Sequence, residues 1–311
     1  MWLLTATLGN FFLMLLQAGE ASKAPITDQQ RLVNTIFENY DKALRPVENT
    51  MTATNVTLNP GLFSIVDTDE ASESIVIAQT FRMMWKDFFL SWNPNEYEGM
   101  KQLLIPLSLI WHPDIFVINL IEIEITLPEE KNYASINYDG SVLVTVPEIV
   151  TFHCKYHINM FPFDVQNCTM RFTSWMYTAE QMDLFHLTQT DLDMYTNSTE
   201  WDFISFLPRK EKVFHGVTEN SWVYINYDLI IQRKPTYYLL TFVLPCVIIT
   251  TISIIGIFAP FNDSGDREEK VTMGLTTMLT MAVIFTVITD QMPKTSEGMP
   301  LLGNEKRPEI K

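Results

Sequence analysis

Residues 237–259 set the strongest limit on how this chain can fold. They contain no charged side chain over roughly 23 positions, and a helix of that length crosses about 30 Å of hydrocarbon. Pro245 lies inside the run, which a membrane helix tolerates where its surroundings satisfy the freed backbone groups. The alternative is a buried helix of a soluble protein. We predict a membrane helix over 237–259, so the chain has a membrane part and a part outside it.

A second apolar stretch follows a short charged segment, and its hydroxyl side chains set it apart. Six of its residues are spaced by four, three, four, three and four positions, so they share one stripe of a helix. Several copies facing inward would line a watery pore with an apolar constriction, and acidic ends would favour cations. The alternative is a helix packed through small polar residues. We predict a pore helix over about 270–290, lined by Glu269, Thr272, Thr276, Leu279, Val283, Thr286 and Asp290.

The N-terminus indicates a secretory route. Residues 1–21 form a short apolar run that ends in small residues, which predicts a cleaved signal peptide. A buried N-terminal helix is the alternative. Secretion makes N-glycosylation signals meaningful, and we predict glycans at Asn55, Asn167 and Asn197. Asn262, between the two membrane segments, would face the cytoplasm and stay unmodified.

Residues 22–235 predict an extracellular, mainly β domain that starts with one helix. Leu32, Ile36 and Phe37 recur at helical spacing, which predicts a helix over 27–45. Short segments of alternating character then follow, separated by turn signals. The predicted strands are 55–58, 72–83, 142–146 and 222–231. We predict an immunoglobulin-like antiparallel β-sandwich followed by transmembrane α-helices.

The charge balance and the missing motifs narrow the function classes. The net charge of −16 disfavours nucleic acid as a partner and suits a domain that attracts cations. The sequence contains no glycine-rich phosphate loop, nucleophile elbow or His-Glu-x-x-His motif. A zinc site at His153, Cys154, His157 and Cys168 has irregular spacing, and the cysteines are better used as a disulfide. We therefore predict no enzyme activity, no metal and no cofactor.

Cys154 and Cys168 frame the most distinctive loop. Thirteen residues separate them, with Phe161-Pro162-Phe163-Asp164 at the centre. In an oxidising compartment a disulfide is favoured, and closing such a loop contributes about 3 kcal/mol on the chain-entropy model. Two unpaired core cysteines are the alternative.

Together these features resemble the Cys-loop family of pentameric neurotransmitter-gated ion channels, on its cation-conducting, nicotinic-acetylcholine-receptor-like side. The resemblance covers about residues 28–303. It rests on the Cys loop, on Trp111-His112-Pro113-Asp114 with Asn119 after it, on the segment from Trp85-Lys86-Asp87 to Trp92-Asn93, on Pro245 and on Glu269-Lys270. It implies a ten-strand ectodomain, four membrane helices around a five-fold axis, and gating by agonist bound between subunits.

The resemblance also implies a ligand site. Trp175 matches the central aromatic residue, which would contact a small amine or quaternary ammonium neurotransmitter through a cation–π interaction. The alternative for Trp175 is a core tryptophan, and core packing is expected for Trp85 and Trp111. The other implied ligand-site residues are Ile118, Thr80, His215, Trp222, Val142 and Val144. These differ from a full aromatic cage, so the agonist is either not acetylcholine or is bound in a heteromer.

Coupling and location follow from the same resemblance. Phe161, Pro162, Phe163, Asp164 and Arg233 would transmit agonist closure to the loop at residues 291–300. The implied setting is the postsynaptic plasma membrane, with a multi-pass chain, an extracellular domain and homologous subunits as partners. The family has two further membrane helices, whereas residues 304–311 are a polar tail. The alternative function is therefore a truncated, non-conducting subunit that acts as a ligand decoy or dominant-negative partner.

Overall fold

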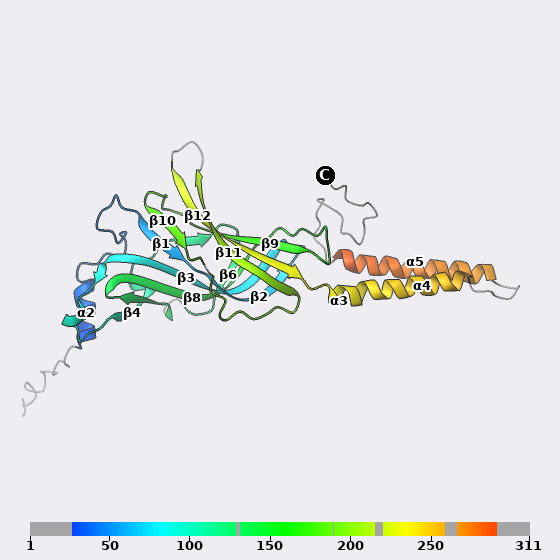
Figure 1. Ribbon diagram of the computed structural model, residues 1–311, viewed down its shortest axis with the longest axis horizontal. Helices are drawn as coiled ribbons and strands as arrows, with labels where there is room; N and C mark the ends of the chain where they lie inside the picture. Colours follow the sequence, from blue (N-terminus) through cyan, green and yellow to red (C-terminus); the bar gives the residue numbers. More distant parts are fainter. Residues whose placement is uncertain (1–26, 129–130, 189, 215–219, 259–265, 291–311) are drawn as a thin grey trace, which may run out of the picture.

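The computed structural model describes residues 27–128, 131–188, 190–214, 220–258 and 266–290. It places a β-sandwich at one end and a pair of helices that project from it at the other (Figure 1). The predicted signal peptide, the polar tail, His215 and Asn262 lie outside the described residues.

The elements keep the labels of Figure 1. The helices are α2 (Asp28–Phe37), α3 (Thr236–Tyr238), α4 (Leu244–Phe258) and α5 (Asp266–Asp290), with short turns η1 (Pro94–Glu96) and η2 (Leu107–Leu109) and a π-helical turn η4 (Leu239–Val243). The strands are β1 (Thr54–Leu58), β2 (Gly61–Asp69), β3 (Ser74–Ser91), β4 (Gln102–Pro106), β5 (Ile115–Val117), β6 (Leu120–Ile125), β7 (Tyr133–Asn137), β8 (Asp139–His153), β9 (Val165–Ser174), β10 (Met182–His186), β11 (Trp201–Phe214) and β12 (Ser221–Arg233).

The described strands form two sheets, which confirms the predicted fold class. One sheet runs β10-β1-β3-β8-β7-β4, with β2 also on β3 and β6 also on β8, and the other runs β11-β12-β9-β5. The pairs are antiparallel except β1 with β10, which is parallel. The described part of the chain has twelve strands, two more than the resemblance implied.

The core lies between the sheets and follows the two-residue period of the strands. Along β8 every second side chain from Val142 to Phe152 is buried. Phe81 of one sheet stacks on Phe172 of the other, with ring centroids 5.4 Å apart. Trp85 and Trp111 are buried edge to face, which confirms their expected core packing.

Helix α2 is shorter than predicted. Thr27 caps it through a reciprocal pair of hydrogen bonds with Gln30, and the helix ends at Phe37 instead of reaching residue 45. The Tyr40 hydroxyl donates to Asp87 (2.7 Å) and accepts from the Trp111 backbone N–H (3.0 Å). These tertiary bonds hold the chain after Phe37 against the sandwich in turns, and they override its local helical pattern.

Within the described residues, two segments are long and apolar enough to cross a membrane, namely Thr236–Gly256 and Lys270–Val287. The first is continuous through α3, η4 and α4, in agreement with the predicted span 237–259. Helix α5 begins at Asp266, earlier than the predicted residue 270. The two helices lie side by side (Figure 1) and are joined by a hydrogen bond from Thr277 Oγ1 to Ser253 Oγ (3.3 Å).

Candidate functional site

Trp175 stands at the end of β9 on a turn that Asp114 holds in place. The Asp114 carboxylate accepts hydrogen bonds from the Ser174 hydroxyl (2.6 Å) and from the backbone N–H groups of Trp175 (3.1 Å) and Met176 (2.8 Å). The Trp175 side chain is 72% exposed, so the alternative of a core tryptophan is wrong. The turn presents a large aromatic face to solvent.

A second aromatic residue, absent from the sequence prediction, joins Trp175. Phe116 on β5 packs edge to face against it, with ring centroids 5.4 Å apart. Pairing of β5 with β9 sets Phe116 opposite Thr173, which explains the proximity. The exposed Ile118 follows on the same segment. Phe116 adjoins the Trp111-His112-Pro113-Asp114 motif, so its aromatic character was the signal available in the sequence.

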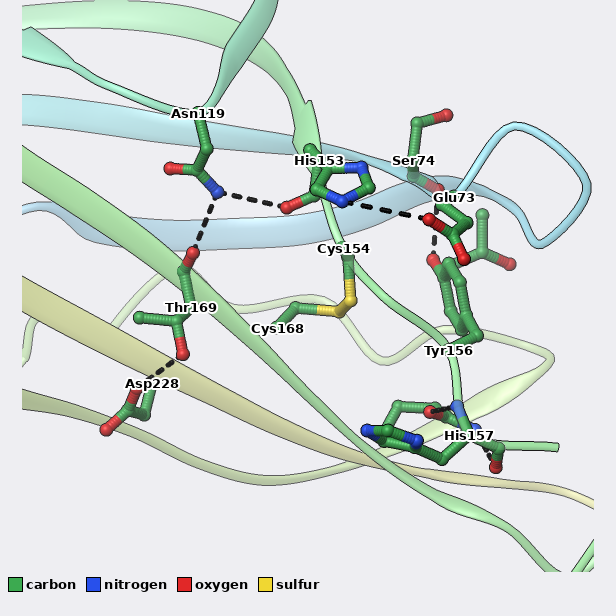
Figure 2. The surroundings of a disulfide bond; sticks show 12 residues. Glu73, Ser74, Asn119, His153, Cys154, Tyr156, His157, Cys168, Thr169 and Asp228 are labelled. Atoms are coloured by element: carbon green, nitrogen blue, oxygen red, sulfur yellow. Dashed lines mark hydrogen bonds and ion pairs between the residues drawn. A yellow bond between two sulfur atoms is a disulfide. The ribbon is translucent and has the colours of Figure 1, made fainter. Parts of the chain in front are cut away.

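Asn119 fixes this segment between the two sheets. Its side-chain amide donates to the backbone carbonyls of His153 on β8 (3.0 Å) and Thr169 on β9 (2.9 Å), as Figure 2 shows. Its side-chain oxygen accepts from the backbone N–H of Arg171 (3.2 Å). These three hydrogen bonds hold the segment that carries Phe116 against both sheets.

The β11–β12 hairpin carries the next predicted residues. Trp222 is half-buried on β12 and faces Val213 in register. His215 lies outside the described residues. Phe214, the last residue of β11, is exposed and is the described aromatic side chain at that place. The predicted role of His215 therefore stays a prediction, and Phe214 is an additional aromatic candidate beside it.

The expected role of Val142 and Val144 is wrong. Their side chains are 1% and 0% exposed and point into the core, so they cannot line an outer face. Because side chains alternate along a strand, the neighbouring Leu143 and Thr145 take the opposite face of β8. Thr145 is exposed and Leu143 is half-buried. The prediction identified the strand but chose the wrong parity.

Thr80 is also buried, which corrects the expectation that it offers an open contact surface. It faces Gly61 in register, and a side chain added at Gly61 would meet both Thr80 Oγ1 (2.8 Å) and Asp191 Cβ (3.1 Å). The segment at Asp191 thus covers Thr80. The accessible pair at this place is Arg82 and Asp191, which form a salt bridge at 2.9 Å.

Cys154 and Cys168 form the predicted disulfide, with Cα atoms 5.0 Å apart. Both are buried, and Figure 2 shows the bond between β9 and the end of β8. The alternative of two unpaired cysteines is wrong, and the zinc alternative loses two of its ligands. Beside the bond, the Tyr156 hydroxyl donates to the Ser74 carbonyl (3.0 Å) and ties the loop to β3.

Arg233 at the end of β12 is the centre of what we call the Arg233 cluster, made of Arg233, Asp164, Glu70, Glu200 and Tyr238. Its guanidinium donates to Asp164 (3.1 Å), Glu70 (2.6 Å), Glu200 (3.0 Å) and the Tyr238 hydroxyl (3.0 Å). Arg233 and Asp164 are each 1% exposed. Burial raises the pKa of Glu70, and Arg233 partly offsets that rise. The pKa of Arg233 is raised: burial opposes the charge, but Asp164 and Glu70 outweigh it.

Aromatic rings enclose the same guanidinium. Its central carbon lies 4.2 Å from the ring centroid of Trp201 and 5.2 Å from that of Phe161. Phe161 packs edge to face on Tyr238 at 4.8 Å. The structure therefore brings Phe161, Asp164 and Arg233 together with the start of the membrane helix. Of the other predicted loop residues, Pro162 is buried and Phe163 is exposed.

The predicted stripe on α5 turns away from α4. Its described members Thr272, Thr276, Leu279, Val283 and Thr286 are all exposed. The side that meets α4 carries Met273, close to Gly256, and Thr277. The side chains of Glu269 and Asp290 lie outside the described residues, although both belong to α5.

The three predicted glycosylation sites are open to solvent. Asn55 lies on β1, Asn167 on β9 and Asn197 in the segment before β11, and all three side chains are exposed. A glycan is bulky and needs a surface position. The geometry is compatible with modification at each site.

Comparison with known proteins places both parts of the chain in one family. Residues 29–235 match the family model of the neurotransmitter-gated ion-channel ligand binding domain. Residues 242–304 match that of the neurotransmitter-gated ion-channel transmembrane region. The two matches together cover most of the chain.

Individual relatives are named as acetylcholine receptor subunits. The chain is 33% identical over 305 residues to neuronal acetylcholine receptor subunit alpha-9 of Gallus gallus, covering 97% of this chain and 60% of the relative. It is 32% identical over 273 residues to acetylcholine receptor subunit alpha-type deg-3 of Caenorhabditis elegans, covering 86% of this chain and 48% of the relative. It is 32% identical over 275 residues to neuronal acetylcholine receptor subunit alpha-9 of Homo sapiens, covering 88% of this chain and 56% of the relative. The chain thus spans about half the length of these relatives.

Proposed function

Because the chain belongs to the family of neurotransmitter-gated ion channels, we propose that it is a subunit of a cation channel opened by a small amine or quaternary ammonium neurotransmitter. The partners would be homologous subunits in a pentamer, and the setting would be the postsynaptic plasma membrane. The extracellular domain would carry glycans at Asn55, Asn167 and Asn197. No catalysis is needed, because a ligand that prefers one of two states shifts their populations.

The observation that carries the proposal is the exposed aromatic pair of Trp175 and Phe116 on a braced turn. A cation over the face of a tryptophan gains about 1–2 kcal/mol when it is desolvated. All the described hydrogen bonds of Asp114 go to the turn at residues 174–176, so its role is to position the Trp175 ring. Direct contact between Asp114 and the ligand is not required. Phe214 and Trp222 on the β11–β12 hairpin would close over the same ligand.

A neighbouring subunit would complete the site with its outer face of β3 and β8. In this chain that face offers Arg82, which is paired with Asp191 from a neighbouring segment, together with Leu143 and Thr145. Most of these side chains are polar or charged, and none is aromatic. We infer that an amine ligand would contact aromatic rings on one side and hydrogen-bonding groups on the other, which separates its ligand preference from that of a fully aromatic cage.

The Arg233 cluster would couple ligand binding to the membrane part. Arg233 ends β12, the strand that continues from the ligand hairpin, and its partners come from the Cys loop, from β2–β3 and from the first membrane helix. A displacement of β12 must therefore strain or rearrange these bonds. In the membrane, the stripe from Thr272 to Thr286 would line the pore, with Leu279 and Val283 as the apolar constriction and Glu269 and Asp290 at the acidic ends.

The test is equilibrium binding of labelled amines, including acetylcholine and choline, to cells that express the full chain. Loss of a 1–2 kcal/mol contact in Trp175→Ala predicts a roughly 5- to 30-fold weaker affinity. Met176→Ala is the matched control, because Met176 is equally exposed on the same turn, and its affinity should stay within threefold. Surface labelling confirms equal expression. Equal affinities of the two variants would contradict the site, and no amine binding at all would contradict the ligand class.

A further inference from the structure

One carboxyl group lies in the sandwich core, away from both the aromatic pair and the Arg233 cluster. Glu148 on β8 is 6% exposed, and its side chain points inward with those of Val146 and Val150. Gln79 on β3 faces it in register and is 0% exposed. Gln79 Nε2 donates to Glu148 Oε1 at 2.7 Å. A glutamate is rarely buried without a partner that balances its charge.

The positions that face this pair carry no other titratable group among the described residues. Ile125 of β6 stands opposite Glu148 in register, and Leu62 of β2 stands opposite Gln79. Across the core, Met170 of β9 lies with its sulfur 4.0 Å from Gln79 Nε2. These three neighbours are therefore apolar side chains.

Arg82, Arg171 and Glu124, three charged residues on strands around the pair, belong to the opposite faces. On β3, Arg82 is paired with Asp191 at 2.9 Å. On β9, the Arg171 guanidinium lies over the Tyr224 ring at 5.3 Å. On β6, Glu124 is exposed and stands opposite Ile149, whose side chain points away from that of Glu148. None of these groups neutralises Glu148.

If Glu148 is ionised, the pair contains a buried acceptor that lacks a hydrogen-bond donor among the described residues. Gln79 Oε1 is buried and has no hydrogen-bond partner in the described structure. A carboxylate can only accept, whereas a protonated carboxyl has an O–H that can donate. A proton on Glu148 would thus remove a buried charge and add a donor beside a vacant acceptor. Burial raises the pKa of Glu148 to about 7, with the Gln79 amide opposing the rise.

We propose that Glu148 and Gln79 form a proton-sensitive pair in the ectodomain core, in which proton uptake by Glu148 stabilises the folded domain. The direction follows from linkage. The folded chain binds this proton more tightly than the unfolded chain, so the stabilisation is complete below about pH 4.5 and is lost as the pH rises through about 7. The separation of these values limits the change in the folding equilibrium to about 300-fold.

The test is thermal unfolding of the purified full chain in detergent at pH 5, 6, 7 and 8, followed by tryptophan fluorescence. Glu148→Gln keeps an acceptor for Gln79 but cannot ionise. We expect it to melt several degrees above the parent chain at pH 8 and within about one degree of it at pH 5. The matched control is Glu124→Gln on the exposed neighbouring strand, whose offset from the parent should not vary with pH. A pH-independent offset for Glu148→Gln would overturn the proposal.

A second variant separates the proton effect from simple repacking. Gln79→Met removes the donor to the carboxylate seen in the described structure while keeping a long side chain. This variant should therefore lose its stabilisation at a higher pH than the parent chain does. The comparison is the double variant Gln79→Met with Glu148→Gln, which should show no such pH dependence. An unchanged midpoint in Gln79→Met would refute the role assigned to the pair. Neither measurement needs ligand, so the outcome is independent of the proposed channel function.

Discussion

The Arg233 cluster offers the sharpest test of how the ectodomain is held to the membrane part. Arg233→Met removes the cation and keeps most of the side-chain volume. It leaves Asp164, which is fully buried, with the Gln166 amide (2.6 Å) as its remaining side-chain donor among the described contacts. Glu70 would lose its partner as well. The change therefore leaves uncompensated charge in the protein interior.

The expected magnitude comes from the burial of each partner. Removing one member of a buried ion pair typically costs about 3–5 kcal/mol, since the other charge stays desolvated. Glu200 contributes little to this figure because its side chain is 42% exposed and solvent screens it. For a domain of this size about 3–5 kcal/mol corresponds to a fall of roughly 6–20 °C in the unfolding midpoint.

A double-variant cycle isolates the interaction. The set comprises the parent, Arg233→Met, Asp164→Asn and the double variant, with midpoints measured on the purified full chain in detergent. The double variant carries no charge at position 164 that could be left unpaired. Its loss of unfolding free energy should therefore be smaller than the sum of the two single-variant losses by about 2 kcal/mol or more. Arg209→Met is the control. Arg209 is exposed and pairs with Asp228 at 3.6 Å, so its loss should be under about 1 kcal/mol.

Two outcomes would refute the reasoning. Additive losses in the cycle would mean that Arg233 and Asp164 do not depend on each other. A loss for Arg233→Met as small as that for Arg209→Met would mean that the buried carboxylates find other compensation. Arg233→Lys adds a graded check. It keeps the charge but not the planar fork that reaches several acceptors, so an intermediate loss is expected.

Two further predictions concern strand parity and the disulfide. Val144→Thr buries a hydroxyl group and should lower the free energy of unfolding by about 1–3 kcal/mol, whereas Thr145→Val on the outer face should change it by no more than about 0.5 kcal/mol. Thermal unfolding measures both changes, and equal effects would contradict the assigned faces. Replacing Cys154 and Cys168 by serine should lower stability by about 3 kcal/mol, whereas Cys246→Ser, at a free thiol, should change little. Reducing agent should reproduce the loss in the parent chain and in Cys246→Ser, but should not lower the stability of the variant that lacks Cys154 and Cys168.

The sequence by itself determined the features that depend on local composition. An uncharged run of membrane length must be a helix that satisfies its own backbone, so the span from residue 237 was visible without a structure. The alternating segments determined the fold class, and the spacing of Cys154 and Cys168 in a secreted context favoured the bond that the structure contains. The family resemblance pointed to Trp175, whose ring the structure leaves exposed, and its role at a ligand stays a prediction.

Tertiary structure decided what depends on register and on long-range contacts. A shift of one residue moves a strand side chain to the other face, so Val142 and Val144 could not be told from Leu143 and Thr145 without the sheet. Helix α2 ends where Tyr40 finds Asp87 and Trp111, both far along the chain. The pairing of Gln79 with Glu148 likewise joins residues 69 positions apart. Such contacts arise only when the strands align, because no local pattern encodes which side chains will face each other.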